Sequence, residues 1–536
     1  MIRILVTDDV DPEGIALLTA VPDFAVDVEP TLPPGVLLGR IGQYQALVGR
    51  SATRISAELL DAATNLRVIG RAGVGVDNVD LDRATELGIA VINAPAGNTI
   101  AVAELFFGSL LGLVRQIPQA ATSMAEGRWD RSTLMGRELK GRRLGIVGVG
   151  RIGTEISRRA HAFGMDVFGF DPYIGDDRFT ALRVHRAQRL EQLLDVADVL
   201  TIHTPLTDET RGMIGARELG LLKRGAIVAN LARGGILDDQ SLLDGLKSGH
   251  IAGAVLDVFE KEPLAADHPL RFAANVLLTP HMGASTYEAQ RNVAVDVAEA
   301  VRDALLSGEL SRSLNVASVS REEWLELQPS MVAAQRAAAV ARAVLVDRGA
   351  REIRGIGLKC GPGVINGSDV LLAAAALGVL EGILESERLN LINARTLAEM
   401  RGLELSVRES DNLGHPDALE VRLDAGGQSL AVEAVALAGT PPRLTRIGEF
   451  HVDVPPRRIL IVLTNNDVPG VIGRVGTVLG EARINIAAYH QSRVAQGGKA
   501  LAAISVDDVV PEAVRQRLLT LPDVLSATVV AFREPV

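Results

Sequence analysis

Short apolar runs alternate with amphipathic segments along the first part of the chain. Runs rich in Val, Ile and Leu at residues 3–6, 46–48, 67–69 and 90–92 predict strands, and intervening segments such as 56–63 have helical spacing. This βαβ alternation is typical of a parallel sheet with helices on both faces. We therefore predict that the chain begins with a doubly wound, flavodoxin-like α/β domain.

A second alternation of the same kind begins near residue 140. Its predicted strands lie at 199–203, 226–230, 254–258 and 276–279. Long helical segments at 99–115 and 287–306 flank it and are expected to cross between the two domains. The first domain would then be discontinuous, at 1–98 and 286–317, with the second domain at 99–285.

The C-terminal part of the chain divides into a segment at 318–454 and a tail at 455–536. The segment contains an Ala-rich helical stretch at 332–346 and an apolar one at 370–384, and it carries no motif of assignable chemistry. Pro-Pro pairs on both sides of residues 443–454 indicate a linker. The tail reads strand, helix, strand, strand, helix, strand, which is the order of a ferredoxin-like βαββαβ unit.

The apolar run that opens the second alternation ends in three glycines with the spacing G-x-G-x-x-G, Gly148, Gly150 and Gly153. A helical segment follows at 154–163, and the next apolar run ends in Asp171, 18 residues beyond Gly153. Such glycines let a helix N-terminus approach a pyrophosphate, and the later acidic residue accepts hydrogen bonds from the adenosine ribose. The pattern predicts a Rossmann domain that binds NAD; the alternative is a glycine-rich turn without a ligand.

Composition narrows the classes of partner. The 536 residues carry a formal net charge of −11 and no long basic run, which disfavours nucleic acid and anionic membranes. The single cysteine, Cys360, excludes an intramolecular disulfide and a cysteine-rich metal site, and it fits a cytoplasmic location. The N-terminus lacks the features of a signal peptide, and the longest apolar stretch is broken by Gly378, Glu381 and Gly382. No membrane span and no metal site are predicted.

Three residues of the second domain stand at or just beyond predicted strand ends, where ligands bind in open α/β sheets. They are Arg233, Glu262 and His281. Hydride transfer from a hydroxy acid requires a group that takes the hydroxyl proton, and histidine suits this because its pKa lies near neutrality. A neighbouring carboxylate would orient the imidazole, and a guanidinium would hold the substrate carboxylate. Taken singly, each residue is more often structural, and their joint placement makes them candidates.

Polar residues also follow the strands of the first domain. They are Arg50, Ser51 and Arg54, then the glycine-rich run at 73–77, then Asn98 and Thr99. This edge of the first sheet is therefore a second candidate site.

Four runs resemble the D-isomer-specific 2-hydroxyacid dehydrogenases. They are GRAGVGVDNVD at 70–80, GVGRIG at 148–153, NLARGG at 230–235 and PHMGAST at 280–286. The length and the tail resemble the long form of that family, which adds an intervening domain and a C-terminal ACT domain. The resemblance implies two doubly wound domains, one for substrate and one Rossmann domain for NAD, followed by an α+β intervening domain and the ferredoxin-like ACT domain.

The resemblance also implies an activity and a set of roles. The expected reaction is NAD-dependent oxidation of 3-phosphoglycerate to 3-phosphohydroxypyruvate, the entry to L-serine synthesis. Arg233, Glu262 and His281 match the catalytic residues, with His281 as the acid-base group. The implied NAD contacts are Gly148, Gly150, Arg151, Ile152, Gly153, Asp171, Thr204, Ala232, Asp257, His281 and Gly283.

The substrate contacts implied by the resemblance lie mainly in the first domain. They are Arg50, Ser51, Arg54, Gly73, Val74, Gly75, Asn98 and Thr99, joined by Arg233 and His281. Arg131 matches an arginine that reaches the phosphate pocket of a neighbouring subunit, which implies a homodimer or homotetramer. Ordinary solvation at the surface is the alternative for Arg50, Arg54 and Arg131.

The ACT-like tail implies an amino-acid effector. Serine-binding ACT domains use the turn after the first strand and an asparagine after the first helix, which here gives Asn465 and Asp467 in a predicted turn at 465–470, and Asn485. Asn465 replaces a bulkier aromatic residue of some serine-inhibited relatives. The effector is therefore open, and a tail that serves only in assembly is the alternative.

Two further functions stay open at this point. One is a related reductase acting on glyoxylate, hydroxypyruvate or 2-oxoglutarate, which the arginines after the first-domain strands disfavour. The other is an NAD-sensing corepressor of the same fold, which the ACT-like tail disfavours.

Overall fold

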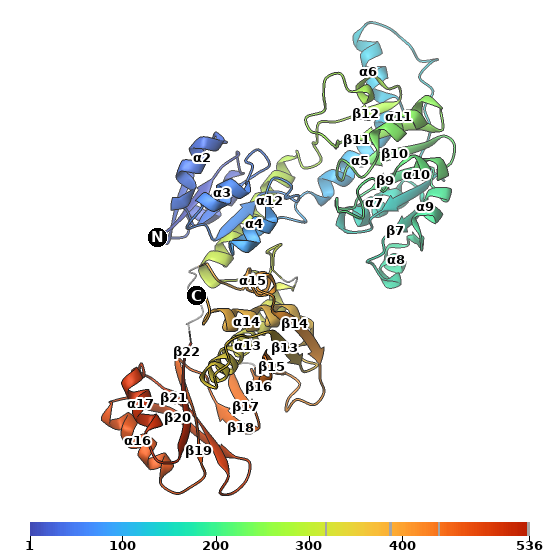
Figure 1. Cartoon of the computed structure of the whole chain (residues 1–536). Coiled ribbons are helices and arrows are strands. Elements are labelled where there is room, and N and C mark those ends of the chain that lie inside the picture. Colours follow the sequence, from blue (N-terminus) through green and yellow to red (C-terminus); the bar gives the residue numbers. More distant parts are fainter. Residues whose placement is uncertain (317–318, 385–387, 438–439, 533–536) are drawn as a thin grey trace.

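The computed structural model describes residues 1–316, 319–384, 388–437 and 440–532. Within these ranges the chain forms four β-sheets, which follow one another along the sequence from blue to red in Figure 1. The first two sheets are parallel throughout, the third is mixed and the fourth is antiparallel. These sheets and the two matched domain types described below confirm the predicted fold class.

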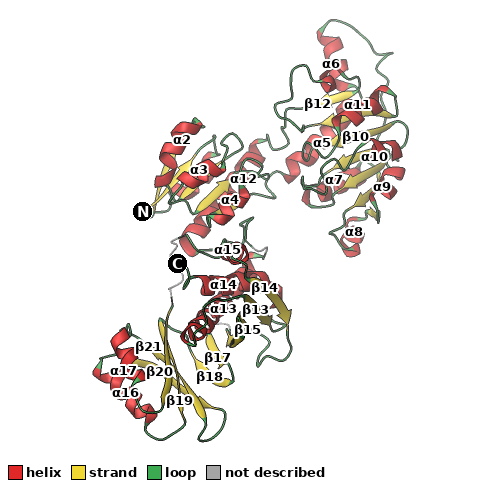
Figure 2. Cartoon of the chain, viewed as in Figure 1, coloured by secondary structure: helices red, strands yellow, loops and turns green. Residues whose placement is uncertain are grey.

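The first sheet has the strand order β2-β1-β3-β4-β5. Its residues alternate between two apolar clusters, with Ile4 and Val6 on one face and Leu5 on the other. Helices cover both faces, as Figure 2 shows for α2, α3 and α4 against α12. The elements are β1 (Ile2–Val6), α1 (Pro12–Thr19), β2 (Phe24–Val28), α2 (Pro34–Arg40), η1 (Ile41–Gln43), β3 (Ala46–Gly49), α3 (Ala57–Ala62), β4 (Val68–Arg71), α4 (Leu81–Glu86), β5 (Ala90–Asn93) and α12 (Tyr287–Ser307).

Helix α12 follows the second sheet in sequence, yet it packs directly on the first. Val297 and Val301 belong to the same core cluster as the residues of β1. A Cβ atom on Gly70 would lie 2.7 Å from both valines, and one on Gly14 would lie 2.6 Å from the carbonyl oxygen of Ala294. The helix therefore approaches the first domain so closely that no larger residue fits at these two positions.

The second sheet has the order β12-β11-β10-β9-β6-β7-β8. The order reverses between β6 and β9, and such a switch point is where open α/β sheets bind ligands. The elements are α5 (Thr99–Val114), α6 (Ile117–Ala125), β6 (Arg143–Val147), α7 (Arg151–Ala162), β7 (Asp166–Phe170), α8 (Asp176–Leu182), β8 (His185–Arg186), α9 (Leu190–Val196), β9 (Val199–Ile202), α10 (Ala216–Leu221), β10 (Ala226–Asn230), α11 (Asp239–Lys247), β11 (Ile251–Leu256), η2 (Pro269–Phe272) and β12 (Val276–Leu278).

The third sheet has the order β14-β13-β15-β16-β17-β18, with helices α13 and α14 packed against each other and α13 against β15 and β16. The elements are α13 (Arg321–Asp347), β13 (Gly355–Cys360), η3 (Ile365–Gly367), α14 (Ser368–Leu380), α15 (Ala394–Met400), β14 (Glu404–Glu409), β15 (Ala418–Ala425), β16 (Gln428–Val435), β17 (Arg443–Ile447) and β18 (Phe450–Val454).

The linker predicted between the proline pairs is wrong. Residues 443–454 form the β17–β18 hairpin at the edge of the third sheet. Leu444 and Val454 are fully buried, so the hairpin completes the core. The prolines stand outside its two strands, where they remove no ladder hydrogen bond.

The fourth sheet has the order β20-β21-β19-β22. Ile461 of β19 packs under helices α16 and α17, whereas Leu460 and Val462 belong to the core cluster of the third sheet. The last two units of the chain thus share one core. The elements are β19 (Ile459–Asn466), α16 (Val471–Glu481), β20 (Ile486–Arg493), β21 (Lys499–Val506), α17 (Glu512–Leu519) and β22 (Val524–Ala531).

Asn465 lies within β19 and not in a turn, which corrects the predicted turn at 465–470. It pairs with Ala500 of β21 and is fully buried. Turn-forming residues such as Asn are tolerated here because neighbouring strands fix the backbone, and tertiary pairing overrides the local preference.

Asparagines from the third unit dock onto the first domain. The side-chain amide of Asn393 donates to the carbonyl oxygen of Glu86 at 3.2 Å, and that of Asn390 donates to the carbonyl oxygen of Gly88 at 2.8 Å. Both carbonyls lie at the C-terminal end of α4, where a helix leaves its last acceptors unsatisfied.

Arg388 and Ile392 extend this contact. Arg388 donates to the carbonyl oxygen of Ala63 at 2.6 Å, at the end of α3, and Ile392 packs into the core cluster of the first sheet. The third unit therefore caps two helices of the first domain.

Among the described residues, no single helix is long and apolar enough to cross a membrane; α5 and α6 reach that length and composition only when the bent pair is counted together.

Asn393→Ala is expected to loosen the docking of the third unit on the first domain. Asn393 is 1% exposed and also donates to the carbonyl oxygen of Arg388, so its loss leaves buried acceptors unpaired at a cost of about 1–3 kcal/mol. Thermal unfolding should begin several degrees lower than in the wild type. Asn412→Ala, at an exposed position, is the control, and equal midpoints for both variants would contradict the assignment.

Candidate active site

The glycine turn after β6 is shaped by two close backbone contacts. Gly148 has φ +88°, and a Cβ there would lie 2.6 Å from the carbonyl oxygen of His203. A Cβ on Gly153 would lie 2.3 Å from the carbonyl oxygen of Gly148. At Gly150, which precedes the first residue of α7, a Cβ would meet nothing within 4 Å. The turn is thus closed toward the protein and open above the helix N-terminus, where free N–H groups attract a phosphate.

Asp171, which directly follows β7, lies beside this turn. Its Oδ2 accepts a hydrogen bond from the backbone N–H of Val149 at 2.9 Å, and its Oδ1 accepts one from Tyr173 at 3.0 Å. At the end of β9, the buried hydroxyl oxygen of Thr204 has no hydrogen-bond partner among the described residues. An open phosphate cradle, an adjacent carboxylate and an unpaired hydroxyl fit a dinucleotide.

His281 and Glu262 form a hydrogen-bonded pair. The distance from His281 Nδ1 to Glu262 Oε2 is 2.7 Å, and Oε1 of the same carboxylate accepts a hydrogen bond from the backbone N–H of Phe259 at 2.9 Å. The imidazole is half exposed, and its hydrogen bond to Glu262 uses Nδ1 and not Nε2. A carboxylate held in this way fixes the ring orientation and stabilises the imidazolium.

Asp257 fixes the loop that carries His281. Its carboxylate is buried and accepts hydrogen bonds from the Thr279 hydroxyl at 2.6 Å and from the backbone N–H groups of Met282 and Gly283 at 2.8 Å each. His281 itself has φ +51°, in the left-handed region. Asp257 therefore sets the backbone on both sides of the histidine, and its expected place near the nicotinamide carboxamide stays a prediction.

Arg233 reaches the first domain. Its Nε lies 3.2 Å from Asp77 Oδ2, and its Nη1 donates to the carbonyl oxygen of Ala232 at 2.7 Å. A Cβ on Gly75 would lie 2.1 Å from Nη2 of Arg233. The guanidinium is thus seated on the glycine-rich loop after β4, between the two parallel sheets.

Arg71, at the end of β4, belongs to this cluster although the sequence analysis did not single it out. Burial lowers its pKa to about 10; the charges of Arg233 and Arg50 act in the same direction, and Asp77 and Asp8 oppose them. Its buried Nε has no hydrogen-bond partner among the described residues. The signal was available, because Arg71 stands inside the run at 70–80 that carries the resemblance.

The other predicted first-domain residues gather at the same edge of the sheet. Arg50 is half-buried, and Ser51 and Arg54 are exposed. At the start of α5, the side-chain oxygens of Asn98 and Thr99 are buried and unpaired within the described part of the chain. Arginines at this edge can bind an anionic group, and the unpaired oxygens of Asn98 and Thr99 can accept hydrogen bonds from a polar ligand.

Some predicted residues lie elsewhere. Arg131 is exposed on the segment after α6, which Figure 1 shows at the end of the second domain away from the first. In the fourth sheet, Asn465 pairs near one end, opposite Ala500, whereas Asn485 precedes β20 at the other end, beside Ile486 opposite Val506. One chain therefore does not bring the predicted effector residues together.

The polar side chains of Asp467 and Asn485 already have partners. Asp467 accepts hydrogen bonds from Arg493 at 2.8 Å and from the backbone N–H of Gly497 at 3.1 Å, and the Arg493 hydrogen bond is the main cause of its lowered pKa. Asn485 donates to Asp507 at 2.6 Å. An effector at either residue would have to replace or extend these contacts.

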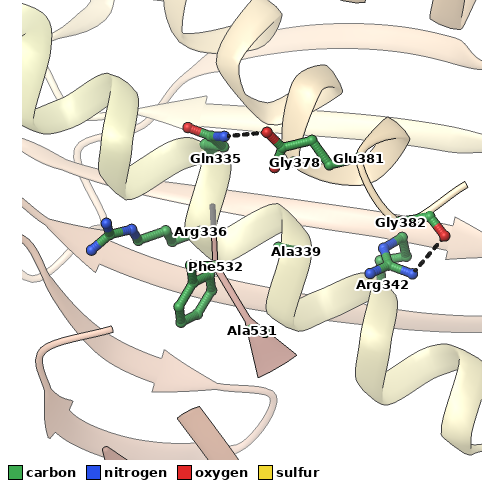
Figure 3. Close-up of a pocket in the computed structure, with 9 residues that line it drawn as sticks. All are labelled: Gln335, Arg336, Ala339, Arg342, Gly378, Glu381, Gly382, Ala531 and Phe532. Carbon is green, nitrogen blue, oxygen red and sulfur yellow. Dashed lines mark hydrogen bonds between the residues drawn. The ribbon is translucent and has the colours of Figure 1, made fainter. Parts of the chain in front are cut away.

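A small pocket of about 80 Å³ lies apart from these residues, between α13, the end of α14 and the end of β22 (Figure 3). Gln335 donates to Glu381 across it at 2.9 Å, and the Arg336 guanidinium lies 5.5 Å from the centre of the Phe532 ring. None of the catalytic, substrate, NAD or effector residues predicted from the sequence lines this pocket.

His203, at the end of β9, has an enclosed imidazole. Its Nε2 shares a hydrogen bond of 2.8 Å with the hydroxyl of fully buried Thr201, and its buried Nδ1 has no described partner. The ring packs edge-on against Phe106 of α5. Burial lowers the pKa of His203 to about 3, so the ring is neutral at physiological pH.

Comparisons with known proteins cover the whole chain. The family description "D-isomer specific 2-hydroxyacid dehydrogenase, NAD binding domain" matches residues 107–283, and "ACT domain" matches residues 458–523. Relatives named D-3-phosphoglycerate dehydrogenase from Methanocaldococcus jannaschii and Bacillus subtilis are each 36% identical, over 99% of this chain and 100% and 99% of theirs. A protein of known crystal structure from Thermus thermophilus is 36% identical, with a TM-score of 0.54, and the match covers 58% of this chain and 100% of that one.

The neutral state of His203 makes stability depend on pH. The unfolded histidine binds a proton below about pH 6.5 and the folded one does not, so this contribution to stability is complete above pH 6.5 and is lost as the pH falls toward 3. When the pH falls from 6.5 to 5, the unfolding free energy of the wild type should therefore decrease by up to about 2 kcal/mol more than that of His203→Gln, because glutamine does not titrate. Denaturant unfolding at the two pH values measures this. Exposed His161→Gln is the control, and identical pH dependence in all three proteins would contradict the prediction.

Proposed function

The chain belongs to the D-isomer-specific 2-hydroxyacid dehydrogenases, which use NAD, and from this premise we propose that it oxidises 3-phospho-D-glycerate to 3-phosphohydroxypyruvate, the first step of L-serine synthesis. The observation that carries the proposal is the cluster of arginines beside the glycine-rich loop after β4, where Arg233 of the NAD-binding domain meets the first domain. The relatives that match over their full length carry the name of this enzyme.

His281 acts as the base in the proposed reaction. Because Nδ1 is hydrogen-bonded to Glu262, Nε2 is the atom that takes the proton of the C2 hydroxyl. Glu262 then stabilises the imidazolium by charge and hydrogen bond. NAD, when bound, accepts the hydride from C2. In the reverse direction the same histidine donates the proton to the carbonyl oxygen.

Arginines hold the two anionic groups of the substrate. Arg233 binds the carboxylate, for which its planar fork offers paired donors. Arg50 and Arg54, with the run at 73–75 and the unpaired side chains of Asn98 and Thr99, bind the rest of the molecule and its phosphate. A substrate with two anionic groups explains why so many cations converge on one edge.

NAD would be held by residues of the second domain. The backbone N–H groups of Arg151 and Ile152 at the start of α7 would bind the pyrophosphate, and Gly148, Gly150 and Gly153 would let it approach the backbone. Asp171 would bind the ribose hydroxyls. Thr204, Ala232, Asp257 and Gly283 would surround the nicotinamide half.

We also propose an oligomer in the cytoplasm, with Arg131 reaching the phosphate site of a second copy. In the segment of the chain that contains Arg131, residues 117–135, several large apolar side chains are exposed, which is typical of a surface that a partner covers. They are Ile117 at 53% exposure, Met124 at 57%, Trp129 at 78% and Met135 at 80%. L-serine is the proposed effector of the ACT domain.

The direct test is the rate of NADH formation with 3-phosphoglycerate and NAD, compared with D-glycerate and titrated with L-serine. The arginine cluster predicts that removal of the phosphate raises KM by roughly 100-fold or more, since about 3 kcal/mol of charge-assisted contacts is lost. Equal rates with D-glycerate, or turnover only with glyoxylate, hydroxypyruvate or 2-oxoglutarate, would favour an unphosphorylated substrate. Tight NAD binding without turnover of any hydroxy acid would favour a sensor.

His281→Ala is expected to lower kcat by roughly 100-fold or more, because the base that takes the hydroxyl proton is removed. NAD should still bind, as measured by calorimetry. His161→Ala, at an exposed histidine of the same domain, is the control. Near-normal turnover of His281→Ala would contradict the assignment of His281 as the base.

Arg131→Ala is expected to raise the KM for 3-phosphoglycerate by about tenfold, with kcat nearly unchanged, because one phosphate contact is lost. Sedimentation should show an unchanged oligomer, whereas Trp129→Glu should dissociate it and raise KM as well. Arg137→Ala, at another exposed arginine of the segment, serves as control. An unaltered KM in Arg131→Ala would exclude the shared site.

A further inference from the structure

Asp8, the second residue after β1, is buried at 5% exposure and points into the loop at residues 50–54. Its Oδ2 accepts the backbone N–H groups of Arg50 at 3.0 Å and Thr53 at 2.9 Å. Its Oδ1 accepts the hydroxyls of Thr53 at 2.7 Å and Thr31 at 2.8 Å. A single carboxylate thus organises both the backbone and a side chain of this loop.

The other side of the loop is held by Asn78. Its side-chain amide donates to the carbonyl oxygens of Arg50 at 3.0 Å and Thr53 at 2.7 Å. The N–H groups of Arg50 and Thr53 therefore go to Asp8, and their C=O groups go to Asn78. With both ends of the loop bound on two sides, the positions of the side chains between them are set by this clamp.

The clamp lies at the switch point of the first sheet. The order β2-β1-β3 places the ends of β1 and β3 side by side where the order reverses, and ligands bind at such points. In the segment that follows β1, Asp8 has φ +66° and Asp9 has φ +51°. Two successive non-glycine residues in the left-handed region are strained, and such strain is concentrated at functional sites.

We propose that Asp8 is the positioning residue of the substrate loop: it fixes the backbone of residues 50–53 so that the arginines of this loop meet the anionic group of the substrate. The inference rests on the proposed function, because it gives that loop the role of binding the phosphate. Asp8 touches neither substrate nor cofactor in this account, and it acts through Arg50 and Arg54.

The charge of Asp8 has a second effect on the same cluster. Together with Asp77 it opposes the lowering of the pKa of Arg71 by burial and by the charges of Arg233 and Arg50. The three arginines converge on one edge, and their mutual repulsion is reduced by these carboxylates before an anion binds. Asparagine at position 8 would keep part of the hydrogen bonding and would lose this compensation of charge.

Asp8→Asn separates geometry from charge. Asparagine tolerates the left-handed conformation, its Oδ1 accepts the two backbone N–H groups, and its Nδ2 donates to the threonine hydroxyls, which rotate. Asp8→Ala loses every contact and also strains the backbone. Asp9→Asn, at the exposed neighbouring carboxylate, is the matched control.

The experiment measures kcat, the KM for 3-phosphoglycerate and the KM for NAD in the four proteins, with thermal unfolding of each. Asp8→Asn is expected to raise the KM for 3-phosphoglycerate by about 5- to 10-fold and Asp8→Ala by roughly 30- to 100-fold. The KM for NAD and the Asp9→Asn values should match the wild type. A residue that serves stability alone would lower the unfolding temperature and leave the KM unchanged.

The outcomes separate the two proposals. If the wild type fails to oxidise 3-phosphoglycerate, the proposed function fails, whatever the variants do. If the wild type is active and folded Asp8→Asn and Asp8→Ala keep its KM, the inference about Asp8 is overturned. Failure of both variants to fold would also overturn it, because Asp8 would then belong to the fold and not to the site.

Discussion

The contact on which the arrangement of the first two domains depends is the packing of α12 on the first sheet. One face of this sheet is covered by α1 together with α12, and α12 follows only after the chain has passed through the whole second domain. The helix then sits so close that glycine is required at Gly14 and Gly70. Two helices cross between the domains: α5 follows β5, the last strand of the first sheet, and α12 follows β12, the last strand of the second sheet. The carboxyl ends of the two sheets are therefore brought to one junction, and residues that act on one substrate can come from both.

Charge at this junction is only partly balanced within the chain. Arg71 is half-buried, and its buried Nε has no partner among the described residues, whereas Arg233 is paired with Asp77, a largely exposed carboxylate. Exposed ion pairs are weak because water competes for both partners. In the proposed function, the anionic substrate would pair with these arginines in place of Asp77. Within the chain, the carboxylates of Asp8 and Asp77 supply negative charges that oppose the lowering of the Arg71 pKa.

The motifs of the first 300 residues predict the fold and much of the site because each has a local physical cause. Close backbone contacts require glycine at Gly148 and Gly153, whereas a Cβ on Gly150 would meet no atom within 4 Å. Arg71 was not singled out from the sequence, because its neighbours Arg50 and Arg233 belong to other segments of the chain and come close to it only in the fold. The β17–β18 hairpin was missed for the opposite reason, since local proline signals outside the strands outweighed its own alternating pattern. Asn465 lies in β19 because the strand pairs with β21 as far as this residue. An asparagine in the sequence predicts a turn, so the sequence alone does not indicate where β19 ends.

The C-terminal units constrain how regulation would operate. The fourth sheet shares its core with α13 and the third sheet, so a change in the ACT domain is felt by the third unit through Leu460 and Val462. The third unit in turn caps α3 and α4, and these helices follow closely on the two loops of the proposed substrate site. Asn465 and Asn485 lie at opposite ends of the fourth sheet, so one small amino acid cannot touch both within a single chain. An effector that uses both residues must bind between ACT domains of two copies, and its signal would then depend on how the chains assemble.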